Sequence, residues 1–202
     1  MRTILLDRDG VINENRSDHV KSWSEFHFLP GALEALRLLT LSKFRIFVVT
    51  NQAIVNRGVV GRAVIDEIHR SMLHVARMHG ALITAVGYCP HRSDERCRCR
   101  KPEPGLLLDM AYTWQFDLRD TYLVGDAITD IAAGQSVGSR CVLVQTGRGR
   151  DQALLPAAAT IRPQQIVPDL LCAVQWILEQ EGLALAHTAQ RVPEQLVLAA
   201  PV

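Results

Sequence analysis

Short apolar runs alternate along this chain with longer segments in which apolar residues recur every three or four positions. The short runs are typical of buried strands, and the longer segments are typical of amphipathic helices. Strands that alternate with helices predict an α/β fold, with a Rossmann-like parallel sheet covered by helices on both faces. The predicted strands are residues 3–6, 45–49, 85–88, 121–124 and 141–144, and the predicted helices are residues 30–41, 64–79, 104–114, 129–137 and 167–180.

The length and composition suit one globular domain with a full core. Of the 202 residues, 48% are hydrophobic and 21% are charged, an ordinary balance for such a domain. The net charge of +1 provides no strong field that would recruit nucleic acid or an anionic membrane. The alternating pattern extends over residues 1–182, which we interpret as a single domain. It fades beyond them, and we interpret residues 183–202 as a loose C-terminal tail.

The start of the chain and its hydropathy favour a cytoplasmic location. The first residues enter a predicted strand at once, without the basic stretch and apolar run of a secretory signal. No window is long and apolar enough to cross a bilayer. We therefore expect a cytoplasmic protein without a membrane or nucleic-acid partner. The sequence does not decide the oligomeric state, and a monomer is the starting expectation.

Reactive side chains follow three of the predicted strands. In parallel sheets the carboxyl ends of the strands meet at one edge, where α/β proteins bind their ligands. Carboxylates gathered there repel one another unless a cation lies between them, and Mg²⁺ prefers such hard oxygen ligands. A carboxylate can also attack phosphorus, and a second one two residues later can act as a general acid and base. These strand-end residues are Asp7, Asp9, Thr50, Asn51, Asp126 and, one helical turn later, Asp130.

Each of these residues also has an ordinary structural interpretation. The pattern Asp-x-Asp-Gly, present at residues 7–10, is common in turns. Thr50 can be a plain strand residue, and Asn51 or Asp126 can cap the helix that follows. Lys101 can be a surface charge, which is the usual environment of a lysine. The occurrence of all these residues at one predicted sheet edge favours the catalytic interpretation.

A loop that follows the third predicted strand contains three cysteines and one histidine. Cys89, His91, Cys97 and Cys99 form a Cys₃His set, which typically binds structural zinc in a tetrahedral site. The alternatives are free thiols and a zinc module that binds nucleic acid, the latter because basic residues surround the loop. The spacing lacks the helical histidine pair of a C₂H₂ finger, which argues against the nucleic-acid module. The other cysteines, Cys141 and Cys172, are interpreted as small buried apolar residues.

The chain resembles the haloacid dehalogenase superfamily of phosphatases in four segments. These are residues 5–13 (LLDRDGVIN), residues 48–52 (VVTNQ), Lys101, and residues 124–130 (VGDAITD). The resemblance covers residues 1 to about 145 and implies a magnesium-dependent phosphatase with an aspartyl-phosphate intermediate. It implies that Asp7 is the nucleophile and that Asp9 is the general acid and base.

The same resemblance assigns the remaining site residues. Mg²⁺ would be bound by Asp7, by the backbone carbonyl of Asp9 and by Asp126, with Asp130 orienting nearby groups. Thr50 and the backbone of Asn51 would hold the phosphoryl oxygens, and Lys101 would neutralise their charge. Phosphoryl transfer needs this combination of positioning and charge neutralisation.

The cysteine-histidine loop resembles that of two zinc-loop families, the D-glycero-D-manno-heptose 1,7-bisphosphate 7-phosphatases and the bacterial histidinol-phosphatases. Residues 7–13, Arg57-Gly58 and Thr146-Gly147 are more similar to the heptose enzymes. The chain departs from their usual pattern at Ala53-Ile54 and at Asp18-His19, which lie on the substrate side.

The substrate expectation follows from the shape and charge of the site. Residues 11–29 and 90–100 are too short for a cap domain, so we expect an open site without one. Its rim would present Arg57, Arg100 and Arg148, whose guanidinium groups suit a second phosphate or a sugar. A phosphorylated sugar, the heptose bisphosphate, is therefore the expected substrate. The alternatives are histidinol phosphate, another sugar phosphate, a polynucleotide end, or no catalysis at all in a zinc-binding scaffold.

Overall fold

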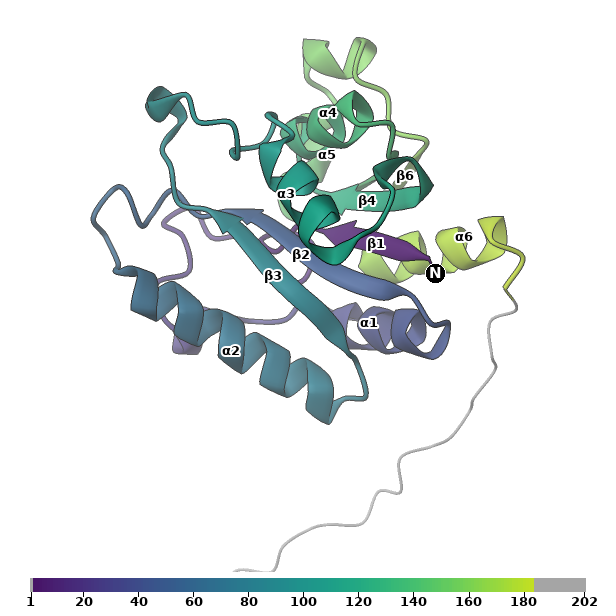
Figure 1. The fold of residues 1–202 in the computed structure, drawn as a ribbon, viewed down its shortest axis with the longest axis horizontal. Coiled ribbons are helices and arrows are strands. Elements are labelled where there is room, and N and C mark those ends of the chain that lie inside the picture. Colours follow the sequence, from purple (N-terminus) through teal and green to yellow (C-terminus); the bar gives the residue numbers. More distant parts are fainter. Residues whose placement is uncertain (1, 184–202) are drawn as a thin grey trace, which may run out of the picture.

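The computed structural model describes residues 2–183. They form a central six-stranded sheet with strand order β3-β2-β1-β4-β5-β6 (Figure 1). Every neighbouring pair of strands is parallel. This confirms the predicted α/β class. The strands are β1 (Thr3–Leu6), β2 (Arg45–Asn51), β3 (Ile83–Cys89), β4 (Thr121–Gly125), β5 (Arg140–Val144) and β6 (Gln165–Val167), and the helices are α1 (Ala32–Leu41), α2 (Arg62–Met78), α3 (Gly105–Trp114), α4 (Ile128–Ser136), α5 (Gly149–Gln152) and α6 (Leu170–Gln180).

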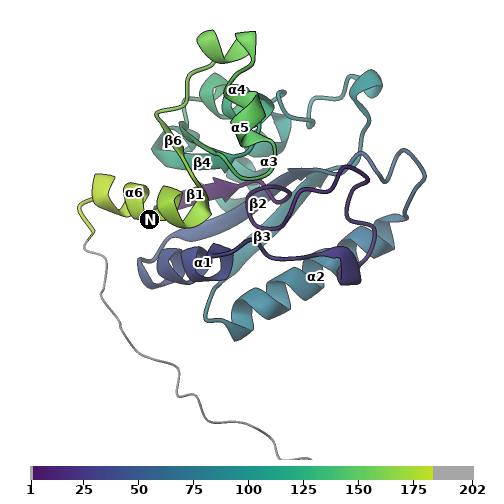
Figure 2. The same ribbon diagram turned by 180° about the vertical axis from the view of Figure 1, so that it is seen from behind.

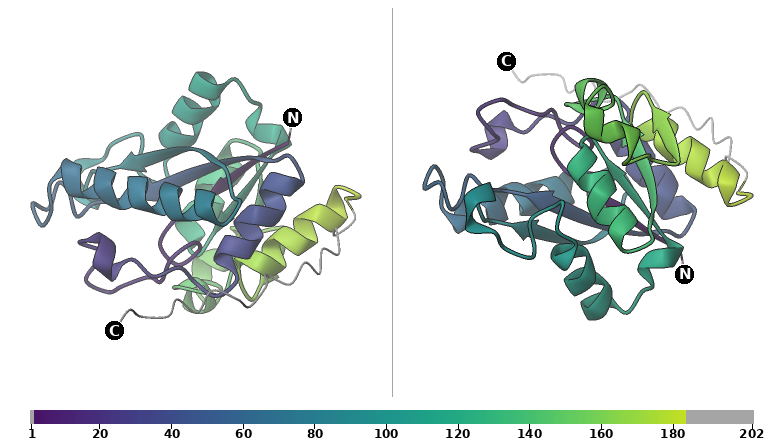
Figure 3. Two further views of the ribbon diagram at one scale, coloured as in Figure 1. Left: turned by 90° about the horizontal axis from the view of Figure 1, so that it is seen from below. Right: turned by 90° about the horizontal axis from the view of Figure 1, so that it is seen from above.

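The helices cover both faces of the sheet because successive strand residues point in opposite directions. In β1, Ile4 and Leu6 belong to the core beneath α1, α2 and α6, whereas Leu5 belongs to the core beneath α3 and α4. In β5, Val142 packs on the first side and Cys141 on the second. Figure 3 shows α1, α2 and α6 in front of the sheet from below, and α3, α4 and α5 in front from above.

The sheet has one more strand than the sequence predicted. β6 pairs with β5, and α6 begins at Leu170 instead of residue 167. A strand of three residues is too short to show an alternating pattern, and only its last residue, Val167, lies within the predicted helix. The side chain of Asp169 caps α6 by accepting a hydrogen bond from the amide of Cys172 at 2.8 Å. The sequence analysis also missed α5.

No cap domain interrupts the described part of the chain. The segment between β1 and α1 contains only the short 3₁₀ helix η1 (Trp23–Glu25), which lies beside α2, and the segment between β3 and α3 contains η2 (Ser93–Glu95). Residues 14–28 of the first segment are hereafter called the flap. They run along one end of the sheet in the view from behind (Figure 2). No helix within residues 2–183 has the length and apolar character needed to cross a membrane.

The end of the last helix is tied to the edge of the sheet opposite the candidate site. Glu181 accepts hydrogen bonds from Tyr122 Oη and Arg140 Nη1, both at 2.9 Å, and from Arg2 Nε at 2.7 Å. The Arg140 guanidinium also lies 3.9 Å from the centre of the Tyr122 ring. The predicted tail falls almost entirely on residues 184–202, which lie outside the described residues.

Candidate active site

Three buried carboxylates meet at the carboxyl edge of the sheet, beyond β1 and β4. One oxygen each of Asp7, Asp126 and Asp130 lies within 4.8 Å of the others. Asp7 directly follows β1, Asp126 directly follows β4, and Asp130 lies in the first turn of α4. β1 and β4 are adjacent, although β2 and β3 come between them in sequence. The fold thus brings these residues together at the topological switch point, as the sequence predicted.

Two glycines allow the surrounding turns to close on Asp126. Gly10 has φ +86° and Gly147 has φ +57°, in the left-handed region that favours glycine. A Cβ at either position would overlap the Asp126 carboxylate. The hydroxyl of Thr146 donates to the Gly10 carbonyl at 2.6 Å and joins the two turns. The segment after β5, which contains Arg148, therefore belongs to the site: the Arg148 amide donates to Asp126 Oδ2 at 2.8 Å.

Lys101 is a buried cation within the acidic cluster. Its Nζ lies 2.9 Å from Asp7 Oδ1 and 2.7 Å from Asp130 Oδ1, and it donates to the carbonyl of Val49 at 2.7 Å. The side chain of Asn51 fixes its backbone, with Nδ2 donating to the Lys101 carbonyl at 3.0 Å and Oδ1 accepting from its amide at 3.2 Å. The structure thus places Lys101 in the site, and the surface interpretation is wrong. Asn51 holds Lys101, a role that the sequence analysis missed.

The electrostatics of the cluster suit a divalent cation. Burial raises the pKa of Asp7 to about 6, with Lys101 acting in the opposite direction. Burial, together with nearby Asp7, also raises the pKa of Asp126. Although burial alone would lower it, Asp130 and Asp7 raise the pKa of Lys101. Asp7 Oδ1 is buried, and within residues 2–183 it has no polar partner besides the ammonium group of Lys101. Buried, under-satisfied carboxylate oxygens are the ligands that Mg²⁺ prefers.

Asp9 lies outside this cluster and is held by a network of donors. Arg8 Nη2 donates to both of its oxygens at 2.9 Å. Asn13 Nδ2 donates to Oδ1 at 2.8 Å, and Gln52 Nε2 donates to Oδ2 at 2.7 Å. Burial would raise the pKa of Asp9, but Arg8 and these amides hold it below the usual range. The sequence analysis predicted Asp9 but none of its partners, although Arg8, Asn13 and Gln52 stood inside the quoted motifs.

His69, in the middle of α2, extends the Asp9 network. Its Nε2 lies 3.0 Å from Arg8 Nη1, and its ring stacks edge-on against Tyr88 with the ring centres 5.4 Å apart. Burial, followed by the charge of Arg8, lowers the pKa of His69 to about 3. The ring is therefore neutral and accepts a hydrogen bond from the arginine. A lone histidine within a helical pattern gave no sequence signal for this role.

A cavity of about 430 Å³ opens onto both the acidic cluster and Asp9. Arg57 from the loop after β2 and His19 from the flap meet at its rim, with Nη1 and Nε2 3.2 Å apart. Arg100 reaches the same cavity and donates to the His91 carbonyl at 3.2 Å. A larger hollow beside α3, of about 780 Å³, contains only one charged pair, Asp117 and Arg119, bonded to each other. The lining of the smaller cavity includes Asp7, Asp9, Thr50, Asn51, Arg57, Arg100, Lys101, Asp130 and Arg148.

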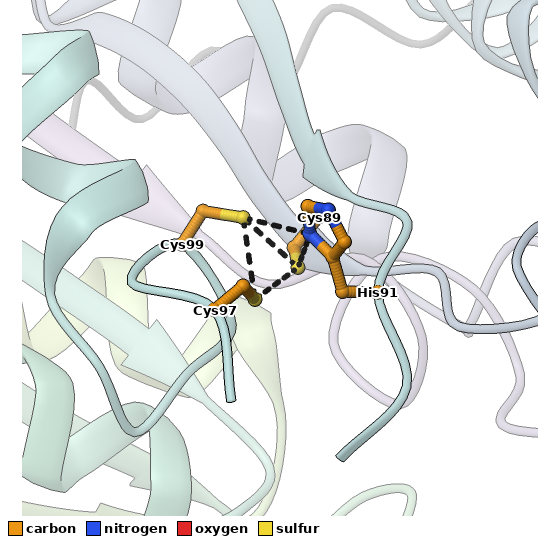
Figure 4. Close-up of side chains that lie close together, drawn as sticks. All are labelled: Cys89, His91, Cys97 and Cys99. Atoms are coloured by element: carbon orange, nitrogen blue, oxygen red, sulfur yellow. Dashed lines mark hydrogen bonds between the residues drawn. The ribbon is translucent and has the colours of Figure 1, made fainter. Parts of the chain in front are cut away.

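The cysteine-histidine loop forms a compact candidate metal site beside this cavity (Figure 4). The Cys89 and Cys99 sulfurs are 3.2 Å apart, and each is 3.6 Å from Cys97 Sγ. His91 Nδ1 is 3.4 Å from Cys89 Sγ and 3.2 Å from Cys99 Sγ. These separations are too long for disulfides and close to the edge of roughly 3.7 Å of a tetrahedron with 2.3 Å zinc–sulfur bonds. Burial raises the pKa of Cys89, so a bound cation would have to replace its proton.

Comparison with known proteins finds relatives over nearly the whole chain. Residues 98–173 match the HAD-hydrolase-like family model. The chain is 34% identical over 182 residues, 90% of its length and 97% of the relative, to the D-glycero-beta-D-manno-heptose-1,7-bisphosphate 7-phosphatase of Neisseria meningitidis serogroup A. It is 38% identical over 153 residues, 71% of its length and 78% of the relative, to the D-glycero-alpha-D-manno-heptose-1,7-bisphosphate 7-phosphatase of Mycobacterium tuberculosis.

A solved structure is similar in both sequence and fold. The crystal structure of D,D-heptose 1,7-bisphosphate phosphatase from B. bronchiseptica, in complex with magnesium and phosphate, superimposes with a TM-score of 0.83. It is 35% identical in sequence, and the match covers 89% of this chain and 99% of the other. The likeness in fold therefore extends over about nine tenths of this chain.

Proposed function

This chain belongs to the HAD-like hydrolase family and is a phosphatase, and from that premise we propose that it removes the 7-phosphate of D-glycero-D-manno-heptose 1,7-bisphosphate. The observation that carries the substrate proposal is the cavity, whose rim is cationic and whose floor holds the buried Asp7–Lys101 pair. The relatives named above, including the structure with magnesium and phosphate, support it.

In the proposed first step, a carboxylate oxygen of Asp7 attacks phosphorus while the bond from phosphorus to the sugar oxygen breaks. Asp9 gives a proton to that departing oxygen. The dianionic substrate favours protonation of Asp9 as it enters, which offsets the low pKa that Arg8 and the amides impose on the free enzyme. The products of this step are the free sugar hydroxyl and an aspartyl phosphate on Asp7.

In the proposed second step, Asp9, now a carboxylate, takes a proton from water. The oxygen of that water attacks phosphorus, the bond to Asp7 breaks, and inorganic phosphate leaves. Thr50 and the backbone of Asn51 hold the phosphoryl oxygens in both steps, and Lys101 offsets their charge. Carboxylate, lysine and backbone donors are thus fixed in place before the substrate arrives, as phosphoryl transfer requires.

Two metal ions complete the proposal. Asp7, the backbone carbonyl of Asp9 and Asp126 would hold Mg²⁺, with the Asp130 carboxylate beside them. Magnesium would supply charge neutralisation between the carboxylates and the phosphoryl group. Cys89, His91, Cys97 and Cys99 would hold a structural zinc that fixes the loop leading to Arg100 and Lys101.

We further propose that residues 1–182 form one domain. We also propose that the protein is a cytoplasmic enzyme that acts as a monomer on a small phosphorylated sugar. Selection at an open rim would come from Arg57 and Arg100, which can bind a second phosphate. The cationic tail of histidinol phosphate would be repelled by the same side chains.

The test is the value of kcat/KM for the heptose bisphosphate measured beside histidinol phosphate and simple hexose phosphates, with and without Mg²⁺. We expect the bisphosphate to be preferred by at least about tenfold, the effect of one lost charged contact. An equal or higher value for histidinol phosphate would contradict the substrate proposal. Phosphate release that does not depend on Mg²⁺ would contradict the metal proposal.

A further inference from the structure

We propose that His69 is a positioning residue for phosphate ester cleavage, which orients the acid–base group Asp9 through the buried side chain of Arg8. The inference rests on the proposed role of Asp9. It adds to the site a residue from the middle of α2, far in sequence from the strand ends that carry the reactive groups.

Arg8 connects the two residues through opposite parts of one rigid group. Its side chain is fully buried. Nη2 donates to both Asp9 oxygens at 2.9 Å, Nε lies 3.3 Å from Oδ1, and Nη1 reaches His69 Nε2 at 3.0 Å. A planar guanidinium fixed at both ends cannot rotate, so the plane of the Asp9 carboxylate is fixed as well.

His69 can hold Arg8 only as a hydrogen-bond acceptor. A guanidinium has no acceptor atom, so the lone pair of Nε2 must face Arg8, and the ring proton must be on Nδ1. The ring is itself held in place: His69 is 6% exposed, and its ring packs edge-on against Tyr88. The helix thereby supplies a fixed point against which Arg8 is oriented.

The remaining contacts of Asp9 predict a partial effect when His69 is lost. Asn13 and Gln52 would still donate one hydrogen bond to each oxygen. They would not prevent the guanidinium from turning toward another acceptor and taking the carboxylate with it. Proton transfer to the departing oxygen depends on such alignment, whereas binding of the phosphoryl group by Thr50 and Lys101 does not.

The test compares two small substrates that need the acid to different degrees. Glycerol phosphate releases an alkoxide, which must be protonated as it leaves; p-nitrophenyl phosphate releases a much weaker base, which need not be. The ratio kcat/KM covers the steps up to ester cleavage, so it isolates the acid role of Asp9 from the later water attack. We expect His69→Phe to lower kcat/KM for glycerol phosphate by about tenfold or more, and for p-nitrophenyl phosphate by less than about threefold.

Three further variants make the result decisive. His69→Gln restores an acceptor near the Nε2 position and should recover most of the loss. Ile68→Val removes one buried methyl group from the same helix without touching Arg8, and should leave the ratio between the two substrates unchanged. In an Arg8→Lys background, which cannot bridge both partners, His69→Phe should add little, because two residues that act through one link are not additive.

Asp9→Asn separates failure of this inference from failure of the proposed function. If Asp9→Asn discriminates between the two substrates and folded His69→Phe does not, His69 does not orient Asp9. His69→Phe could also lower kcat/KM equally for both substrates, in proportion to its loss of folded protein. That result would likewise show that His69 does not orient Asp9. If Asp9→Asn itself shows no discrimination, Asp9 is not the acid, and the inference is overturned together with that assignment.

Discussion

Asp7 and Asp9 stand two residues apart in one turn, yet their surroundings shift their pKa values in opposite directions. Burial raises the pKa of Asp7 to about 6, whereas Arg8, Asn13 and Gln52 hold that of Asp9 below its usual range. Such divergence within a pair of carboxylates is typical of groups with different catalytic roles. The difference arises because one carboxylate faces the acidic cluster and the other faces an arginine.

The first prediction concerns Asp7, the proposed nucleophile. Asp7→Asn should lower phosphate release by several powers of ten, because an amide oxygen is far too weak a nucleophile for phosphorus. The fold should persist, since the substitution removes one of three buried like charges. Asp109→Asn, at an exposed aspartate that pairs with Arg98, is the matched control and should retain full activity. Thermal unfolding checks the fold, and substantial turnover by folded Asp7→Asn would rule out the assignment.

The second prediction concerns pH and His69. Its pKa is about 3 in the folded protein, against an ordinary value near 6.5, so between these values the unfolded chain binds a proton that the native state does not. Stability from this residue is therefore lost as pH falls through that window. Relative to His69→Phe, the wild type should lose about 1.6 kcal/mol of unfolding free energy between about pH 6.5 and about pH 5.

The check is denaturant unfolding of both proteins at neutral and mildly acidic pH. Taking the difference between the two removes the contribution of the other histidines and carboxylates. A difference in unfolding free energy that stays constant between the two pH values would show that His69 is not held in its neutral form by the fold.

At the residue scale, the sequence predicted the side chains that stand at strand ends and missed those that hold them. Asp7 and Asp126 directly follow apolar strands, so an architectural rule places them together, and Asp9 lies two residues further along the same turn. Arg8 is fully buried because Asp9 and His69 bond it, and a buried arginine is rare enough that the pattern alone does not suggest it. His69 comes from a helix whose spacing shows only that one face is buried.

Among the elements, the cysteine-histidine loop is the clearest case in which burial does not account for the local structure. Its residues between Cys89 and Cys99 are mostly polar and partly exposed, and only the 3₁₀ helix η2 lies among them. Four ligand atoms at 3.2–3.6 Å spacings would replace the missing core. Lys101 comes two residues after Cys99, so the loop is directly continuous with the lysine that pairs with Asp7 and Asp130.

We therefore predict one tightly bound zinc per chain, and its loss in Cys97→Ser. Without it the loop should loosen and misplace Arg100 and Lys101, lowering phosphatase activity by about tenfold to 100-fold, the scale of small displacements in an active site. Cys172→Ser, on α6 and away from the loop, is the matched control and should keep both zinc and activity. Elemental analysis after purification without chelator gives the answer, and unaltered zinc in Cys97→Ser would refute the ligand set.

The elements that the sequence predicted are those long enough to show a period. Helix α2 and strand β2 were recognised from their apolar spacing, and their bounds differ from the prediction by two residues at most at each end. Strand β6 and helix α5 have three and four residues, hardly more than one period of a strand or a helix, which is too few to establish a pattern. Their positions depend on pairing with β5 and on the contact of Arg148 with Asp126, which are tertiary effects.

In the molecule as a whole, positive and negative charges nearly balance, but within the site they are separated into different regions. The net charge is +1, yet the cavity has an acidic cluster and a buried lysine at its floor and arginines at its rim. Three segments distant in sequence supply that rim: the flap with His19, the loop after β2 with Arg57, and the cysteine-histidine loop, which leads into Arg100. Because residues 2–183 contain no cap domain that could close over the cavity, we expect selectivity to come from these rim contacts.

The last prediction tests that rim. Arg57 is exposed, and within the described residues its side-chain hydrogen bond is with His19 at 3.2 Å, so its guanidinium can turn to a second phosphate without breaking a buried pair. Arg57→Ala should lower kcat/KM for the heptose bisphosphate by about 10- to 100-fold, the effect of losing a charge-assisted contact of about 1.5–3 kcal/mol. For a small ester with one phosphate, such as p-nitrophenyl phosphate, the loss should be less than about threefold, because that phosphate would lie on the floor of the cavity beside Lys101. Arg62→Ala, at an exposed arginine in the first turn of α2 that does not line the cavity, is the matched control for lost positive charge. Equal losses for both substrates, or an equal effect of Arg62→Ala, would mean that the rim acts through general electrostatics and does not recognise the second phosphate.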